Sequence, residues 1–124
     1  STAQQICRAY GGEATVRFRG IAPPVQNDLE LTRLLEQVAL EQLGRERVLE
    51  LEQPSLGAED FAHYLGHVPG CMFRLGVAGP EGCAPLHNGA FNPEEACLPL
   101  AVELLSATLR RWLEQHCQQS GAAL

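Results

Sequence analysis

His87 is the residue of this chain whose type and position best suit chemistry. It lies in a glycine- and proline-rich loop, residues 78–91, between an apolar run and the start of the last predicted helix. Loops that follow a buried strand carry many of the functional groups of α/β proteins. A neutral imidazole in such a loop can bind a metal ion while a backbone carbonyl holds its other ring nitrogen. The alternative, an ordinary surface histidine, stays open from the residues alone.

Two other pairs have spacings that occur in metal sites. His63 and His67 are four residues apart, which on a helix places both side chains on one face. The glutamate that follows the first histidine in zincins is missing, and Gly66 indicates that the helix ends there, so we predict a solvated helix surface. Cys83 precedes His87 by four residues, but two ligands are too few for zinc. We interpret the cysteines as small apolar side chains.

A short segment, Gly57-Ala58-Glu59-Asp60, precedes a predicted short helix. Glu59 and Asp60 at a helix start complement the positive end of the helix dipole or cap its free amides. The functional alternative is that the amides of Gly57 and Ala58 face a ligand carboxylate. The bare sequence favours the first interpretation.

Local signals define the elements that must position these residues. Gly11-Gly12 ends a helix over residues 1–10, and strict alternation predicts a half-buried strand over 13–19. Two prolines in residues 21–28 indicate a linker. Beyond it, Asp28 is predicted to cap a helix that runs to about Leu43 and that Gly44 closes. The pattern then predicts strands over 47–52 and 71–77, a short helix near 55–65, and a last helix that begins at Asn92-Pro93 or at Pro99. This order predicts an α/β fold.

The last helix is predicted to bury one long apolar face, which comprises Leu98, Val102, Leu105, Leu109 and Trp112. The helix over 28–43 is predicted to bury Leu31, Leu34, Leu35 and Val38.

Composition excludes several classes of protein. The chain has 124 residues, 45% of them hydrophobic and 19% charged, which is typical of globular proteins. Its net charge is -6 and its nine basic residues, all arginine, are scattered, which argues against nucleic-acid binding. No apolar run approaches the roughly 20 residues of a membrane span. Five cysteines form an odd set without a CxxC pair, which favours free thiols in a reducing compartment and a cytoplasmic location.

In order, several segments resemble the C-terminal part of the zinc amidohydrolase family of aminoacylases, hippurate hydrolases and carboxypeptidases. The segments that show this resemblance are NDLELTRLLEQVALEQLG, then PSLGAEDFAHYLGHVPGCMFRLG, then PLHNGAFNPEEACLPLAVELL. Each motif is weak alone, but the ordered set is specific. The similarity covers roughly residues 10–115.

The resemblance implies an architecture with two domains. Residues 1–20 are expected to be the last helix and strand of an inserted lid domain that commonly dimerises. Residues 21–28 are expected to be the linker that returns to the catalytic domain. Residues 29–124 are expected to be the second half of a three-layer α/β/α catalytic domain with a central mixed sheet.

The resemblance also implies a reaction. In this family a pair of divalent metals, with zinc most common and manganese possible, activates the water that attacks the amide of an N-acyl amino acid or small peptide. Carried over residue by residue, only His87 matches a metal ligand, whereas Gly57, Ala58, Glu59 and Asp60 match a loop that lines the substrate cleft. The family's general base and its other ligands belong to an N-terminal half that no segment here matches. No catalytic residue is therefore predicted in this chain.

Two hypotheses from different classes follow. The first is the C-terminal segment of a metal-dependent amidohydrolase or peptidase; the second is a non-catalytic binding or assembly module derived from that family. A free-standing site of histidine and cysteine is disfavoured. If the chain is half of a catalytic domain, we expect it to be ordered only beside a partner, which is its own N-terminal half, a second copy in a homo-oligomer, or another protein chain. Apolar helix faces around Leu34, Leu105 and Trp112 are expected to stay partly uncovered without it.

Overall fold

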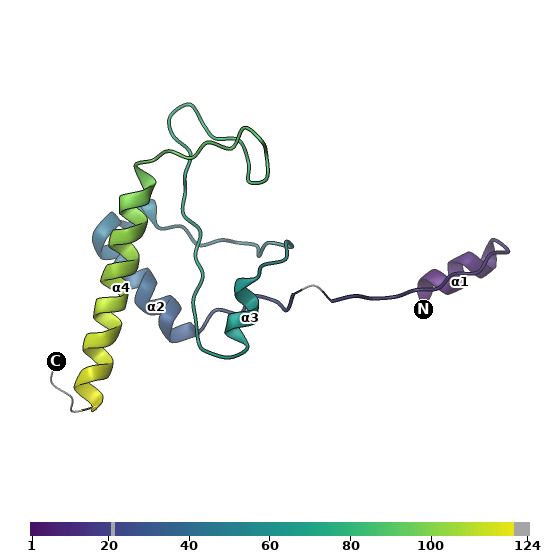
Figure 1. The fold of residues 1–124 in the computed structure, drawn as a ribbon, viewed down its shortest axis with the longest axis horizontal. Coiled ribbons are helices and arrows are strands. Elements are labelled where there is room, and N and C mark those ends of the chain that lie inside the picture. Colours follow the sequence, from purple (N-terminus) through teal and green to yellow (C-terminus); the bar gives the residue numbers. More distant parts are fainter. Residues whose placement is uncertain (21, 121–124) are drawn as a thin grey trace.

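A computed structural model describes residues 1–20 and 22–120 of the chain (Figure 1). Its helices are α1 (Thr2–Ala9), α2 (Leu29–Leu43), the 3-10 helix η1 (Arg45–Arg47), α3 (Phe61–Leu65) and α4 (Cys97–Ser120). Ile21, which begins the predicted linker, and residues 121–124, which end the predicted catalytic segment, lie outside the described residues.

Local capping fixes both ends of α2. Asp28 precedes the helix in an extended conformation, and its Oδ1 accepts a hydrogen bond from the Leu31 amide at 2.9 Å. Gly44 closes the helix with a φ of 82°, a conformation that glycine adopts without strain, and its amide donates to the Leu40 carbonyl. Both predicted bounds of this helix are confirmed.

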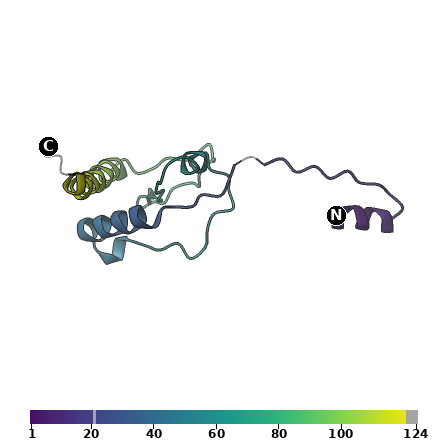
Figure 2. The ribbon, with the colours of Figure 1, turned by 90° about the horizontal axis from the view of Figure 1, so that it is seen from below.

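The core lies between α2 and α4, which run side by side in both ribbon views (Figure 2). Leu35, Val38 and Ala39 of α2 pack with Leu104 of α4. Half-buried side chains complete this cluster; they are Val48, Cys71, Phe73 and Ala107. The predicted buried stripe of α2 is confirmed for Leu34, Leu35 and Val38, and Leu34 is therefore not the uncovered side chain that we expected.

α4 differs from its prediction in its start and in its buried face. It begins at Cys97, so Asn92 does not cap it, and Pro99 falls in the first turn, where no intrahelical amide bond is lost. Cys97 and Leu104 are buried, whereas the predicted apolar face is largely exposed. The exposed fractions are 59% for Leu98, 64% for Val102, 54% for Leu105 and 58% for Leu109. We call these four residues the exposed stripe of α4.

The three segments predicted as strands do not form strands among the described residues. Residues 13–19 and 71–77 lack regular secondary structure, and η1 replaces the start of 47–52. The one bridge described joins Gly79 and Gly82 within a turn. A strand requires a second strand to accept its backbone hydrogen bonds, and the described residues offer none. Within residues 1–20 and 22–120, the helical part of the predicted α/β fold is therefore present, whereas the sheet is not.

Residues 1–20 stand apart from the core. α1 is capped by a reciprocal pair of contacts between Ser1 and Gln4, and it ends before Gly11. No side chain of residues 1–20 belongs to the core cluster, and Phe18 is 94% exposed. In Figures 1 and 2, α1 projects away from α2, α3 and α4. The division into residues 1–20, 21–28 and 29–124 stays a prediction. Within the described part of the chain, no helix is both long and apolar enough to span a bilayer.

One ion pair joins the two core helices. Arg111 Nη2 of α4 donates to Glu41 Oε2 of α2 at 2.6 Å, and Gln37 donates to the other carboxylate oxygen at 3.1 Å. The hydrogen bond from Arg111 is the main reason that the pKa of Glu41 lies below its ordinary value, and the Gln37 bond adds to the effect.

The lowered pKa makes the contact between α2 and α4 sensitive to acid. Because the folded pKa lies below the unfolded one, the pair stabilises the fold above the unfolded pKa, and this stabilisation is lost as pH falls through the folded pKa. We expect an NMR titration of the Glu41 side-chain carboxyl carbon to show a midpoint below the ordinary value of a glutamate. Arg111→Gln should raise the Glu41 midpoint. Equal midpoints for Glu41 in both proteins would contradict the pairing.

Candidate functional site

The backbone places His87 at the tip of a tight turn. The Asn88 amide donates to the Pro85 carbonyl at 3.2 Å, so Pro85 to Asn88 form a hydrogen-bonded β-turn with His87 in third position. His87 has a φ of 68°, and among the described residues it is the one non-glycine residue with a positive φ. That conformation costs a residue with a side chain roughly 1–2 kcal/mol. Such strain occurs most often at functional sites, and here it presents an exposed imidazole.

A second turn follows at once and holds the same loop. Asn88 Oδ1 accepts a hydrogen bond from the Ala90 amide at 2.8 Å, and the Asn88 carbonyl accepts one from the Phe91 amide at 2.9 Å. Phe91 is half-buried and anchors this end of the loop. His87 is therefore mounted between two consecutive turns rather than on a free loop.

Three contacts close the base of the loop. The Glu94 amide donates to the Val77 carbonyl at 2.8 Å, and the Gly82 amide donates to Gly79 at 2.9 Å. The Cys83 thiol lies 3.2 Å from the Asn92 carbonyl oxygen, to which it can donate. Cys83 therefore contacts the loop backbone in this structure. All five cysteines are free thiols.

The predicted substrate segment is exposed and partly engaged with itself. Gly57 donates its amide to Ser55 Oγ at 3.2 Å. Glu59 is half-buried, and its Oε1 accepts from the Phe61 amide at 3.1 Å, at the start of α3. Asp60 makes no capping hydrogen bond with its side chain, and Ala58 is exposed. The Glu59 contact is the helix-start role that the sequence favours; ligand binding by the segment remains a prediction.

The described residues alone do not assemble a metal site. Within residues 1–20 and 22–120, no group of three or more histidine, cysteine, aspartate or glutamate side chains is placed to hold an ion. His87 is thus one donor, whereas zinc sites in proteins use three or four protein ligands. A metal ion at His87 would need ligands from outside these residues.

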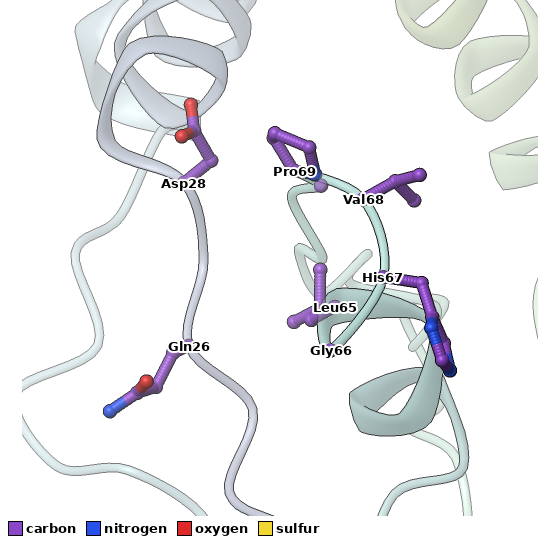
Figure 3. Close-up of a pocket in the computed structure, with 8 residues that line it drawn as sticks. Gln26, Asp28, Leu65, Gly66, His67, Val68 and Pro69 are labelled. Atoms are coloured by element: carbon purple, nitrogen blue, oxygen red, sulfur yellow. The ribbon is translucent and has the colours of Figure 1, made fainter.

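An open cavity near α3 does not alter this result. About 310 Å³ in volume, it is lined by Gln26, Asp28 and residues 65–70. Figure 3 shows that the His67 ring and the Asp28 carboxylate point in different directions. Asp28 Oδ1 already accepts from the Leu31 amide, and α3 ends at Leu65, before His67. His63 and His67 are both exposed, as the sequence predicts for a solvated surface.

Sequence reasoning missed Asn27, which holds the segment beyond α3. Its side-chain Nδ2 donates to the Met72 carbonyl at 2.7 Å, and its Oδ1 accepts from the Met72 amide at 3.0 Å. The next residue, Asp28, donates its amide to the Gly70 carbonyl at 2.8 Å. Nothing in the local sequence predicts a contact across 45 residues. Asn27 thus pairs with the backbone of Met72 as a neighbouring strand would.

Comparison with known proteins shows the family to which this chain belongs. Residues 4–111 match the model of peptidase family M20/M25/M40, and the chain belongs to this family. The resemblance seen in the sequence motifs is therefore confirmed.

Several curated relatives of this chain are named for a hydrolytic activity. A probable hydrolase of Synechocystis sp. is 43% identical over 103 residues, which are 82% of this chain and 26% of that protein. An N-acetyl-L-cysteine deacetylase of Bacillus subtilis is 30% identical over 91% of this chain and 26% of its own length. An N-acetyldiaminopimelate deacetylase of Anoxybacillus flavithermus is 33% identical over 87% of this chain and 27% of its own length. The chain thus spans about a quarter of the length of these relatives. No solved structure matches it significantly.

Proposed function

We propose that this chain is the C-terminal segment of a metal-dependent amidohydrolase or peptidase that hydrolyses the amide bond of N-acyl amino acids or small peptides. The observation that carries the proposal is His87, held at a φ of 68° in a hydrogen-bonded turn. Membership of the M20/M25/M40 family supports it, as do relatives that are named hydrolase and deacetylase. In this proposal residues 29–124 are the second half of a three-layer α/β/α catalytic domain with a mixed sheet.

The proposal assigns this chain's residues limited roles. His87 contributes one ligand to a divalent metal, zinc or manganese, of a dinuclear centre in the intact enzyme. Gly57, Ala58, Glu59 and Asp60 line the substrate cleft. A bound divalent metal supplies an activated water and polarises the amide carbonyl. One histidine is too few ligands for a metal site, so the other ligands must come from a further polypeptide segment. In this proposal that segment also supplies the general base.

We also propose partners and a location for this chain. The partner is the missing N-terminal half of the enzyme or another protein chain, within a homo-oligomer. The free thiols support a reducing compartment, and we propose the cytoplasm.

A chimeric enzyme tests this proposal. The segment of the Synechocystis hydrolase that matches this chain is replaced by residues 4–111, and the parent hydrolase serves as the reference on a panel of N-acetyl amino acids. We expect the chimera to hydrolyse the substrates of the parent, and His87→Ala to lower its kcat/KM about 100-fold or more, because a metal ligand is lost. His63→Ala, which removes an exposed histidine of α3, should leave kcat/KM within about twofold.

The result separates the two hypotheses. A folded chimera without turnover, under conditions in which the parent is active, would favour the alternative of a non-catalytic binding or assembly module. Equal loss of activity in His87→Ala and His63→Ala would remove the specific role given to His87.

A further inference from the structure

We propose that Asn88-Gly89, directly after His87, is a site of spontaneous deamidation, and that its isoaspartate product opens the second of the two turns that hold His87. The modification does not depend on the proposed function, because its chemistry needs only these residues and water. Its consequence for a metal centre rests on the proposed function.

The residue that follows each asparagine decides whether this reaction can begin. The chain has three asparagines, and deamidation starts when the backbone nitrogen of the next residue attacks the side-chain carbonyl carbon. Asn92 precedes Pro93, whose nitrogen carries no hydrogen and cannot act as the nucleophile. Asn88 precedes Gly89, which has no Cβ to hinder its nitrogen or to restrict the backbone as it reaches the attack geometry.

The structure rather than the sequence protects the remaining asparagine, Asn27. Its side-chain Nδ2 and Oδ1 both bond to the Met72 backbone, at 2.7 and 3.0 Å. The nitrogen that would attack, the Asp28 amide, already donates to the Gly70 carbonyl at 2.8 Å. The nucleophile and the electrophile at Asn27 are therefore both held in other contacts.

At Asn88 the same groups are available. Asn88 and Gly89 are exposed, and within the described part of the chain neither the Gly89 amide nor the Asn88 Nδ2 has a hydrogen-bond partner. Asn88 Oδ1, in contrast, accepts from the Ala90 amide at 2.8 Å. Attack at the side-chain carbon makes this oxygen an oxyanion, and a positioned N–H donor stabilises such a charge. The turn thus frees the nucleophile and the leaving group while it supports the intermediate.

The reaction needs no reagent other than water. The Gly89 amide loses its proton to hydroxide, its nitrogen forms a bond to Asn88 Cγ, and the bond from Cγ to Nδ2 breaks with release of ammonia. The product is a cyclic imide that joins both carbonyl carbons of residue 88 to the Gly89 nitrogen. Water then adds to one of these carbons and breaks its bond to nitrogen. Opening at Cγ gives aspartate, and opening at the original main-chain carbonyl gives isoaspartate.

Isoaspartate removes the geometry on which the second turn depends. The main chain becomes one carbon longer, the former Oδ1 becomes its carbonyl oxygen, and the former carbonyl becomes a free carboxylate. These are the two oxygens that accept from the Ala90 and Phe91 amides. The positive φ of His87 persists only where its surroundings hold it, so opening this turn releases the imidazole from its fixed position.

Incubation of the full 124-residue chain at mildly alkaline pH tests the modification. Each asparagine is followed by peptide mass spectrometry, with the aspartate and isoaspartate peptides separated by chromatography. We expect loss of Asn88, with Asn27 and Asn92 reacting about tenfold more slowly or not at all. Gly89→Ala should slow the loss of Asn88 about tenfold. The turn accommodates this variant, because a Cβ at Gly89 meets no atom within 4 Å and its φ is not positive.

Amide hydrogen exchange tests the opening of the turn. In the deamidated chain the Ala90 and Phe91 amides should exchange about tenfold faster than in the fresh chain. The Leu31 amide, which donates to Asp28 at the start of α2, is the internal control and should not change. A synthetic peptide of residues 84–94 gives the rate of deamidation without the fold.

The outcomes are distinct. Retention of Asn88 in the chain under conditions in which the peptide loses it would show that the fold protects the site, and would overturn the proposal. Equal loss at Asn27, or the same rate in Gly89→Ala, would also overturn it, as would unchanged exchange at Ala90 and Phe91. Deamidation with faster exchange supports the proposal. If the zinc content of the chimera is then unchanged, this proposal stands and the metal-ligand role of His87 in the proposed function is contradicted.

Discussion

The isolated 124-residue chain should show no amide hydrolysis with added zinc or manganese. Among its described residues, one histidine, His87, is exposed on a strained turn, and no group of three possible metal ligands is found. Zinc sites need three or four protein ligands. We expect release of free amine from N-acetyl-L-cysteine and N-acetyldiaminopimelate to equal that of buffer with the same metal. Relative to the parent Synechocystis hydrolase, the rate of amide hydrolysis by the isolated chain should therefore fall below the detection limit.

One control makes this result informative. A chimera in which residues 4–111 of this chain replace the matching segment of the hydrolase should be active, which would show that these residues are competent. Turnover by rigorously purified chain that disappears in His87→Ala would contradict the account, because it would mean that this chain assembles a metal site alone.

The second large effect concerns the exposed stripe of α4. Its four residues are each more than half exposed, and full burial of one such side chain stabilises a fold by roughly 1.5–3 kcal/mol. Native domains are stable by only about 5–15 kcal/mol, so several uncovered leucines remove a large share of that margin. We expect the chain alone to self-associate or to melt without cooperativity, as measured by sedimentation velocity and by circular dichroism at 222 nm.

A pair of variants separates the stripe from general charge effects. Leu105→Glu with Leu109→Glu should reduce self-association of the isolated chain. It should also abolish association of the chain with a Synechocystis hydrolase from which the segment that matches this chain has been deleted. Arg110→Glu, which changes charge on the polar arc of the same helix, should do neither. A compact monomer of the parent chain that melts cooperatively above about 60 °C would count decisively against an uncovered interface.

How well the sequence predicts this fold depends on whether the controlling contacts are local. The bounds of α2 follow from Asp28 and Gly44, whose side-chain and backbone preferences act within four residues, and both are correct. The start of α4 at Cys97 lies between the two predicted starts, because Asn92 and Pro93 suit a helix start as well as a loop. In the structure the Asn92 carbonyl instead lies against the Cys83 thiol.

Non-local contacts explain the larger errors. Alternation along residues 13–19 and the apolar run of 71–77 match strands, but a strand exists only where another strand pairs with it. The apolar arc of α4 is so wide that its pattern cannot tell which part faces α2. Packing decides this, and it buries Leu104 while leaving Leu105 exposed.

In the candidate site, too, the features set by local sequence could be predicted and those set by non-local contacts could not. The type and loop position of His87 make it a candidate from the sequence. Its positive φ could not be predicted, because the Pro85–Asn88 bond and the later contact of Glu94 with Val77 set the loop. Asn27 was missed because its partner, Met72, is 45 residues away.

The central claim is that His87 supplies one ligand to a metal centre completed by another segment of an M20/M25/M40 protein. Metal content, measured by atomic emission on protein dialysed against zinc and then against metal-free buffer, tests it directly. The account predicts that the isolated chain retains no zinc and that the chimera retains zinc stoichiometrically. His87→Ala should lower the zinc content of the chimera, whereas His63→Ala should leave it unchanged. Equal zinc in the chimera with and without His87, or stoichiometric zinc in the isolated chain, would contradict it.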